Sequence, residues 1–474
     1  MKLFRNFFIL CVALTTIGCA DDLDDVFANE SDIKNFIYRG LNTFYLYKPE
    51  VDVLADAAFA STQELEEFHS QFPSPEAWFE SLIFDRERTD RFSILVQDYV
   101  ALENLLSGSS LSNGLEFGLV AESGSPTAVY GYVRYVQPGS SAAAAGIMRG
   151  QIFNRVNGIA LTRSNLNTLL SPTTYTIGFA TLSAGTTTDL PEEVELTKTA
   201  FQEDPILLTR VIDQGSQKIG YLVYNSFLSQ FDEQLNGVFA DFAAQGVTHL
   251  VLDLRYNGGG SVNTAVILGS LISGNPVTDV YSTEEWNPDI QQFFMDNEPE
   301  RLVNFFKNQT DNGTPLNSLN LSRVHILTTP STASASELVI NSLEPYIDVV
   351  QVGTSTSGKF QASVTLYDSP NFRRAGVNPS HRYAMQPLVL KSINSAGVTD
   401  YFDGLEPDIA LQEDFGNLGT LGDPTEPLLQ AALNDILLNG RRTQFSNPVN
   451  SEEIMGSNSF KPFGNEMWID LDKP

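Results

Sequence analysis

Residues 323–343 read RVHILTTPSTASASELVINSL, and this stretch indicates what kind of domain the chain builds. RVHILTT is an apolar segment typical of a buried strand, whereas ASELVINSL has apolar residues at helical spacing. A short serine-containing loop separates the two segments. A serine at the end of such a loop lies at a helix N-terminus, among free N–H groups and at the positive end of the helix dipole. The pattern therefore predicts an α/β sheet and makes Ser334 a candidate nucleophile.

The neighbouring segments repeat this alternation of strands and helices. VTHLVLDLR is an apolar strand, YNGGGS turns the chain and VNTAVILGSLISG reads as a helix, and DVVQVG and QASVTLY are two further strands. Alternating strands and helices predict a sheet that is covered on both faces. We expect this catalytic domain to span residues 206–440, with a polar and loosely packed C-terminal tail over 441–474.

The residues ahead of this domain have different patterns. Residues 31–105 read mostly as helices, with Ser31 as a possible N-cap of the first. Residues 106–205 change to short strands and turns. The predicted fold class is therefore α/β in an α+β multidomain chain, with an N-terminal helical region, a small β domain and an α/β catalytic domain.

The glycines of Asn257-Gly258-Gly259-Gly260 directly follow the strand LVLDLR. Without side chains, such a backbone can approach a ligand closely. Together with the amide that follows the serine, it could bind a developing oxyanion. A phosphate-binding interpretation is weak because no Gly-Lys-Ser/Thr follows. The alternative is a flexible turn between a strand and a helix.

A serine nucleophile also needs a base. The four histidines, His69, His249, His325 and His381, are scattered through the chain, and none lies in a stretch built around it. A lysine can accept the proton when burial keeps it neutral. Lys359, in TSTSGKFQASV, is the only lysine between positions 307 and 391. The alternatives are that Ser334 is only a helix N-cap and that Lys359 is a surface residue.

Four motifs in order, DLRYNGGGSV, TASASELV, TSTSGKFQASV and YFDGLEPDI, resemble those of the carboxy-terminal processing peptidases, also called tail-specific proteases. The resemblance implies that Ser334 is the nucleophile and that Lys359, 25 residues later, is its general base. It also implies that the backbone amides of Gly259 and Ala335 bind the oxyanion, with Gly258 or Gly260 as alternatives to Gly259.

The family resemblance leaves one further position open. Many members have a helper glutamine four residues after the lysine, where this chain has Ser363. Gln361 lies two residues after the lysine, and positions two apart in a strand face the same side. Gln361 is therefore the predicted helper that orients Lys359, with Ser363 as the alternative.

The β domain carries a second resemblance. AVYGYVRYVQPGS and SAAAAGIMRGQIFNRVNGIAL resemble a PDZ domain, with Gln151 where aspartate is usual. The resemblance implies that the loop over residues 115–119 holds a peptide's terminal carboxylate on backbone N–H groups, with Phe117, Gly118 and Leu119 as the binding residues. The alternative is a generic small β domain.

The N-terminus predicts export and lipidation. Lys2 and Arg5 precede a short apolar run that ends in Thr16-Ile17-Gly18-Cys19, which resembles a bacterial lipoprotein box. We therefore expect a signal peptide over 1–18, a lipid on Cys19 and an acidic tether over 19–30. The acidic run ADDLDD resembles a surface-export signal, with a solvated tether as the alternative. The expected location is the outer membrane of the cell envelope, and the mature chain has no disulfide.

Composition limits the partners. The formal charge of −30 argues against nucleic acid as a partner. The residues suggest no metal and no organic cofactor, and they do not indicate an oligomeric state. The predicted function is that of a serine endopeptidase acting on extended or C-terminally exposed polypeptides through an acyl-enzyme. One alternative is a catalytically weak or inactive peptide-binding lipoprotein of the same fold; an esterase is disfavoured because no Gly-x-Ser-x-Gly surrounds these serines.

Overall fold

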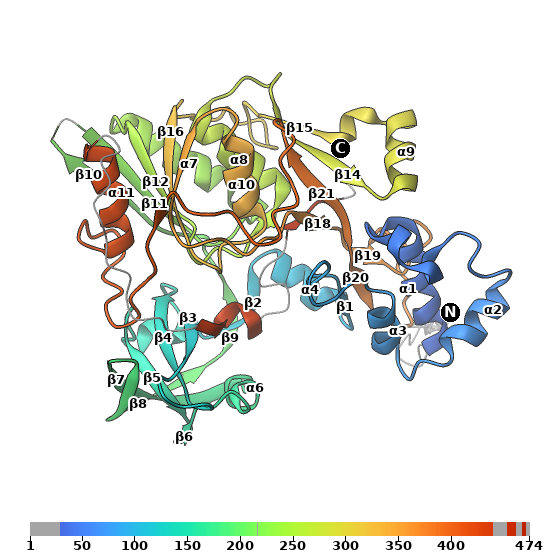
Figure 1. Cartoon of the computed structure of the whole chain (residues 1–474), viewed down its shortest axis with the longest axis horizontal. Coiled ribbons are helices and arrows are strands. Elements are labelled where there is room, and N and C mark those ends of the chain that lie inside the picture. Colours follow the sequence, from blue (N-terminus) through green and yellow to red (C-terminus); the bar gives the residue numbers. More distant parts are fainter. Residues whose placement is uncertain (1–28, 216, 439–452, 461–466, 471–474) are drawn as a thin grey trace, which may run out of the picture.

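The structure, a computed structural model, describes residues 29–215, 217–438, 453–460 and 467–470. The predicted signal peptide, Cys19 and nearly all of the acidic tether lie outside these ranges. No helix within the described ranges is long and apolar enough to cross a bilayer. Figure 1 shows a large α/β part, a β domain below it and the N-terminal helices to one side.

A six-stranded sheet forms the centre of the large part. Its strand order is β10-β11-β12-β16-β17-β22, and all strands except β10 run parallel to their neighbours. The strands are β10 (Ile206–Gln214), β11 (Gln217–Tyr224), β12 (His249–Asp253), β16 (Arg323–Thr328), β17 (Asp348–Gly353) and β22 (Ile409–Ala410). The carboxyl ends of parallel strands meet at one edge, so the loops that follow β12 and β16 come together there. The predicted α/β architecture is confirmed.

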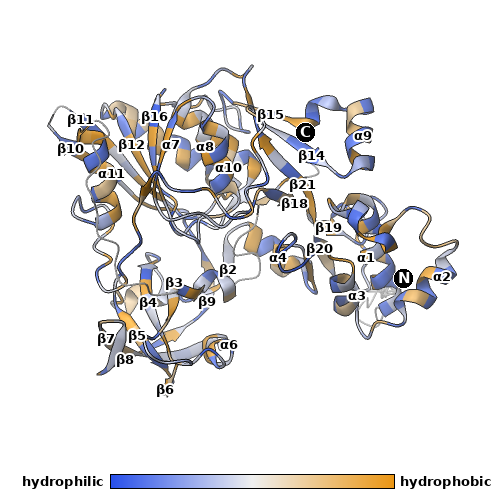
Figure 2. Ribbon diagram, in the orientation of Figure 1, coloured by the Kyte–Doolittle hydropathy of each residue, from blue (hydrophilic) through white to orange (hydrophobic). Residues whose placement is uncertain are grey.

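Helices cover both faces of this sheet because its strands alternate their side chains. Leu250 and Leu252 pack in one apolar cluster with three helices, whereas Val251 packs on the opposite face with another helix. The first three are α7 (Asp232–Ala244), α8 (Val262–Ser273) and α10 (Ala335–Leu343), and the opposite one is α11 (Pro427–Leu438). Figure 2 shows hydrophobic residues throughout the central strands and α8, as expected for elements buried between layers.

A second six-stranded sheet lies next to the first. Its order is β13-β24-β18-β21-β14-β15. The strands are β13 (Gly260–Ser261), β24 (Met467–Trp468), β18 (Gln361–Ser363), β21 (Leu388–Asn394), β14 (Val280–Trp286) and β15 (Val303–Phe305), and α9 (Pro288–Asn297) follows β14. β13 begins at the end of the glycine-rich loop, and β18 begins two residues after Lys359. This sheet therefore carries two of the segments that the sequence singled out.

The N-terminal region is helical but joins the large part through a strand. Its helices are α1 (Glu30–Phe44), α2 (Thr62–His69), α3 (Pro75–Ser81) and α4 (Tyr99–Leu106). β1 (Ile94–Val96) pairs with β20 (Ala384–Gln386), which pairs with β19 (Leu366–Tyr367). The predicted N-cap of the first helix is wrong: Asn29 is the N-cap, and its side chain accepts a hydrogen bond from the Ser31 N–H at 3.1 Å. The helix begins earlier because Asn29, too, is a good capping residue.

The β domain is an antiparallel sheet with two short helices. Its strands are β3 (Leu115–Ala121), β4 (Val129–Val136), β5 (Ile152–Val156), β6 (Ile159–Ala160), β7 (Thr174–Ser183) and β8 (Thr186–Thr197), with α5 (Ser141–Ala144) and α6 (Leu166–Leu170). A two-stranded ribbon of β2 (Ser109–Ser112) and β9 (Thr199–Gln202) flanks it in the chain. The sequence predicts a loop over residues 115–119, but these residues form β3, because they pair along β4.

The C-terminal tail corrects another expectation. The sequence predicts a loosely packed tail over 441–474, but the described parts of it form ordered structure. β23 (Glu453–Gly456) pairs antiparallel with β3, a 3₁₀ helix (Ser457–Phe460) follows, and β24 lies inside the second sheet with Met467 fully buried. Polar composition misleads here because an added strand is held by its backbone hydrogen bonds more than by its side chains.

Candidate active site

Ser334 immediately precedes α10 in an unusual backbone conformation. Its φ is 66° and its ψ is −115°, a conformation that costs a non-glycine residue about 1–3 kcal/mol. The side chain is fully buried. Ser334 and Glu337 have the arrangement of a capping box, but only the carboxylate half has good geometry: the Ser334 N–H donates to Glu337 Oε2 at 2.7 Å. Ser334 Oγ has no hydrogen-bond partner among the described residues. Ser334 is therefore the N-cap residue of α10, but its hydroxyl makes no capping hydrogen bond.

One buried carboxylate connects the serine to the lysine. Glu337 Oε2 accepts hydrogen bonds from the N–H groups of Ser334 at 2.7 Å and Lys359 at 2.9 Å. Its Oε1 accepts from Thr356 Oγ1 at 2.5 Å and from the Gly358 N–H at 2.7 Å. Burial raises the pKa of Glu337, although these four donors oppose the shift. The two backbone nitrogens that share Oε2 lie at most about 5.6 Å apart, the sum of the two distances. No pattern in the sequence indicated a role for Glu337.

Lys359 is fully buried, which excludes the alternative of a surface lysine. Its Nζ lies 4.5 Å from the centroid of the Phe92 ring, which comes from the N-terminal region. The neighbouring Arg91 donates to the carbonyls of Ser357 and Gly358, at 3.1 Å each. The N-terminal region therefore helps to fix the loop that presents the lysine. No pattern in residues 91–92 indicated this contact.

The two predicted partners, Ser334 and Lys359, share one buried region, but their direct hydrogen bond is not formed. Because Ser334 Oγ has no partner among the described residues, its hydroxyl does not bond to Lys359 Nζ here. Catalytic hydrogen bonds are often long in unliganded enzymes and tighten when substrate binds. The proton transfer from Ser334 to Lys359 stays a prediction.

Gln361 and Ser363 differ in how their polar groups are used. Gln361 Nε2 donates to the Tyr47 hydroxyl at 2.8 Å, whereas its buried Oε1 has no partner among the described residues. Ser363 Oγ donates to Gln386 Oε1 at 2.8 Å and lies 3.2 Å from the carbonyl oxygen of Met467. The amide oxygen of Gln361, at the start of β18 and two residues after Lys359, is thus an available acceptor, while the Ser363 hydroxyl is occupied.

The glycine-rich loop adopts conformations that favour glycine. Gly259 has φ of 116° and Gly260 has φ of 140°, and a Cβ on Gly260 would lie 2.3 Å from the Phe227 carbonyl oxygen. The Gly259 N–H donates to Asn257 Oδ1 at 2.9 Å, so this predicted oxyanion donor is engaged. Ala335 is the first residue of α10, and its N–H has no acceptor within the helix. Gly258 and Gly260 stay open as alternatives to Gly259.

Asn257 holds the glycine-rich loop against the serine loop. Its carbonyl oxygen accepts from the Ala333 N–H and from Ser336 Oγ, at 3.1 Å each, and its Nδ2 donates to the Tyr224 carbonyl at 2.9 Å. Thr332 Oγ1 donates to the Leu254 carbonyl at 2.9 Å. These bonds place the predicted oxyanion loop beside the predicted nucleophile.

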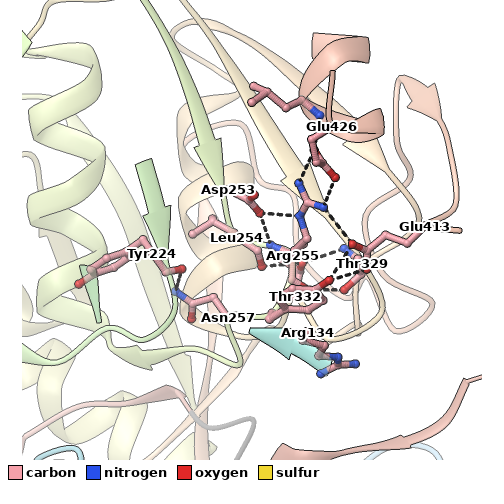
Figure 3. Close-up of polar contacts among 12 residues, drawn as sticks. Arg134, Tyr224, Asp253, Leu254, Arg255, Asn257, Thr329, Thr332, Glu413 and Glu426 are labelled. Carbon is pink, nitrogen blue, oxygen red and sulfur yellow. Dashed lines mark hydrogen bonds and ion pairs between the residues drawn. The ribbon is translucent and has the colours of Figure 1, made fainter. Parts of the chain in front are cut away.

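A buried ion-pair network fixes the end of β12, as Figure 3 shows. Arg255 contacts Asp253 at 2.9 Å, Glu413 at 2.9 Å and Glu426 at 2.7 Å. Arg149 of the β domain also reaches Glu413, at 3.0 Å. Arg255 and Arg149 lower the pKa of Glu413 to about 2, against the opposing effect of burial. The network therefore connects the β domain to the strand that leads into the glycine-rich loop.

The remaining predicted residues lie on β3 and in the core. Phe117, Gly118 and Leu119 lie along β3. The edge of β3 that faces away from β4 pairs with β23. His325 contacts Asp435 at 2.9 Å and His381 contacts Asp368 at 3.0 Å, so both are core histidines with partners. Within the described residues, no cluster of three or more His, Cys, Asp or Glu side chains could hold a metal ion.

Comparisons with known proteins agree with this geometry. A sequence model of peptidase family S41 matches residues 218–410, and a model of the peptidase S41 N-terminal domain matches residues 32–94. The chain belongs to peptidase family S41. The predicted enzyme class, a serine peptidase, is confirmed at this level. The two S41 models together cover the central sheet from β11 to β22 and the first three N-terminal helices.

The S41 chain is similar to several named proteins. It is 26% identical over 353 residues to the chloroplastic C-terminal processing peptidase of Tetradesmus obliquus, covering 69% of this chain and 67% of that protein. It is 23% identical over 272 residues to the carboxyl-terminal-processing protease of Synechocystis sp., covering 53% of this chain and 58% of that protein. The chain thus spans about three fifths to two thirds of the length of these two relatives.

Solved structures share the fold. An S41 protease of Bacteroides fragilis NCTC 9343 superposes with a TM-score of 0.66 at 26% identity, covering 85% of this chain and 97% of that one. The photosystem II D1 C-terminal processing protease superposes with a TM-score of 0.50 at 18% identity, covering 85% of this chain and 97% of that one. The second likeness concerns the fold alone.

Proposed function

We propose that this S41 peptidase is an endopeptidase that cleaves extended or C-terminally exposed polypeptides with a Ser334/Lys359 dyad. The observation that carries the proposal is the state of Ser334: its hydroxyl is buried and unpartnered among the described residues, its backbone is strained, and Glu337 joins it to Lys359. A strained residue at a helix N-terminus is typical of a functional site. A serine with a purely structural role would use its hydroxyl.

The mechanism follows from these positions. Lys359, in its neutral amine form, takes the proton of Ser334 Oγ as the oxygen attacks the scissile carbonyl carbon. The oxyanion binds the Ala335 N–H and an amide of the glycine-rich loop. Lys359 then gives the proton to the leaving amine, which departs and leaves an ester on Ser334. Lys359 next accepts a proton from water as that water attacks the ester, and the proton returns to Ser334 Oγ when the carboxylic acid product leaves.

The side chains around the dyad have supporting roles in this proposal. The orphan Oε1 of Gln361 would accept a hydrogen bond from the lysine amine and orient it, while Tyr47 fixes the other end of the amide. The Gly259 N–H would have to leave Asn257 Oδ1 to bind the oxyanion. In this proposal Gln361 and Gly259 change their hydrogen bonds when substrate binds, and the hydrogen bond between Ser334 and Lys359 forms at the same time.

The β domain is proposed to be a PDZ-like module that binds a polypeptide by strand addition at β3. Support comes from an antiparallel sheet with a peptide-sized edge at β3, where Gly118 and Leu119 pair with another segment. For the exported form, we propose a lipid on Cys19 that anchors the protein to the outer membrane. Metabolic labelling with a clickable fatty acid tests the anchor: Cys19→Ser should lose the label and membrane association, and retention of both would contradict it.

The proposed chemistry is tested with a fluorophosphonate probe and with cleavage of fluorescent casein, an unfolded polypeptide. Wild type should be labelled at Ser334 and should cleave casein, and Ser334→Ala should do neither. Lys359→Met should lose cleavage, whereas the matched Lys391→Met should keep it, because Lys391 lies on the neighbouring strand with partners Glu285 and Asp400.

The alternative function is a peptide-binding lipoprotein with little or no chemistry. It is favoured by Ser363, which stands where many members of the family have the helper glutamine and whose hydroxyl already donates to Gln386. Identical behaviour of wild type and Ser334→Ala in both assays would support this binding protein and overturn the peptidase proposal.

A further inference from the structure

The chain's own C-terminal segment occupies the edge of β3 that faces away from β4. β23 (Glu453–Gly456) pairs antiparallel with β3, so that Glu453 lies opposite Val120, Met455 opposite Leu119 and Gly456 opposite Gly118. Figure 1 shows this red segment beside β3. It runs along the same edge that we propose for an incoming polypeptide.

The next residues fill the position predicted for a terminal carboxylate. Ser457 Oγ accepts a hydrogen bond from the Phe117 N–H at 3.2 Å and donates to the Glu116 carboxylate. The Phe460 ring lies 6.0 Å from the Phe117 ring, centroid to centroid. The side chains of Ile454, Met455 and Phe460 pack, half-buried, against the core of the β domain. Residues 453–460 thus make backbone, polar and apolar contacts of the kind a bound peptide makes.

A charged contact fixes the start of the segment. The Glu453 carboxylate accepts hydrogen bonds from Arg134 and from the Tyr132 hydroxyl. Arg134 is almost completely buried and also donates to Ser331 Oγ at 2.9 Å. Since a buried arginine needs a counter-charge, a polypeptide that replaces the segment should offer an acidic group at the same place.

The strand β23 is short compared with β4, β7 and β8 of the same sheet. It has four residues and a register irregularity between Glu453 and Met455, and all three of its side chains are only partly buried. On the opposite edge of β3, the eight-residue β4 pairs along the whole strand. Short edge elements with few buried contacts open at low cost. β24 differs, because Met467 is fully buried between β13 and β18, and it would stay in place.

We propose that residues 453–460 are an intramolecular competitor that occupies the peptide-binding edge of β3, so that a substrate polypeptide binds there by displacing them. The inference rests on the proposed function of the β domain, but its test does not depend on catalysis. A tethered copy competes at an effective concentration of order millimolar. If the segment's own intrinsic Kd for the β3 edge is ~100 μM, this competition weakens the binding of any other peptide there about tenfold.

The test uses a fluorescent peptide with the sequence of residues 453–460, EIMGSNSF, in a Ser334→Ala background without the lipid anchor. Ile454→Asp should release the segment, because it places a carboxylate against apolar side chains. Fluorescence anisotropy should then show about tenfold tighter peptide binding than the parent protein does. Amide hydrogen exchange reports whether the segment has left. Release without tighter binding overturns the proposal.

A reversible cross-link keeps the test decisive if that variant unfolds. Leu119→Cys with Met455→Cys joins residues that lie opposite each other, and the mature chain has no other cysteine once Cys19 is omitted. The oxidised protein should not bind the peptide, and the reduced protein should bind it; Met455→Cys alone should not respond to oxidation. Equal binding in the two redox states overturns the proposal. Failure of the peptidase proposal would instead appear as unchanged casein cleavage in Ser334→Ala.

Discussion

Replacing Glu337 by glutamine tests whether one carboxylate holds the dyad together. The carboxylate accepts four hydrogen bonds, two at each oxygen. The amide of glutamine has the same shape, but its NH₂ group cannot accept. Either the N–H groups of Ser334 and Lys359 would face another donor, or the Gly358 N–H alone would, because the Thr356 hydroxyl can turn and accept from the NH₂ group.

The expected magnitude follows from this count. A buried donor without an acceptor costs about 1–3 kcal/mol, so the loss is about 1–3 kcal/mol when only the Gly358 N–H faces the NH₂ group and about 2–6 kcal/mol when the N–H groups of Ser334 and Lys359 do. Folding stability is only about 5–15 kcal/mol, so the loss should be visible in urea unfolding. If the displaced Ser334 and Lys359 raise the activation free energy by about 2.7 kcal/mol, kcat should fall about 100-fold. KM should change little, because the buried Glu337 is a positioning residue.

The assay combines fluorogenic peptide kinetics with urea unfolding for wild type, Glu337→Gln and a matched control, Glu344→Gln. Glu344 follows the last residue of α10 and is exposed, so its substitution should leave both kcat and the unfolding midpoint nearly unchanged. The reasoning fails if Glu337→Gln keeps kcat within threefold of wild type at a temperature where it is folded. A rise in KM at constant kcat would also refute it.

Two further predictions concern the helper residue and the ion-pair network. Gln361→Ala should lower kcat about tenfold because it removes the unpartnered acceptor that we propose orients Lys359. Ser363→Ala should mainly lower stability, by about 1 kcal/mol, because its hydroxyl already bonds elsewhere; the reverse ranking in peptide kinetics would make Ser363 the helper. Because the pKa of Glu413 falls from 4.5 to about 2 on folding, its ionisation stabilises the protein by about 3 kcal/mol above pH 4.5, and that contribution disappears as the pH falls toward 2. The stability difference between wild type and Glu413→Gln, measured by urea unfolding, should therefore shrink on acidification; a difference independent of pH would contradict this origin.

Much of the site could be predicted because its parts are local. A strand, a loop and a helix were visible around Ser334 because apolar periodicity and helix-start residues act within one or two turns of chain. The glycines after β12 were visible for the same reason, since their positive φ is a local requirement. Parallel strand order then places the two loops at one edge of the sheet.

Contacts between segments that are far apart in the sequence could not be predicted from such local patterns. Tyr47 bonds Gln361 across 314 positions, and Ser457 bonds the Phe117 amide across 340. The sequence predicts a loose polar tail, since neither hydropathy nor charge distinguishes it from a solvated segment. A sheet edge offers the same backbone donors and acceptors to any extended chain, so its partner depends on which segment the completed fold brings there. The sequence by itself determined the strand, loop and helix around Ser334, because these depend on neighbouring residues, whereas only the tertiary structure decided that Glu337 joins the serine to the lysine and that residues 453–456 pair with β3.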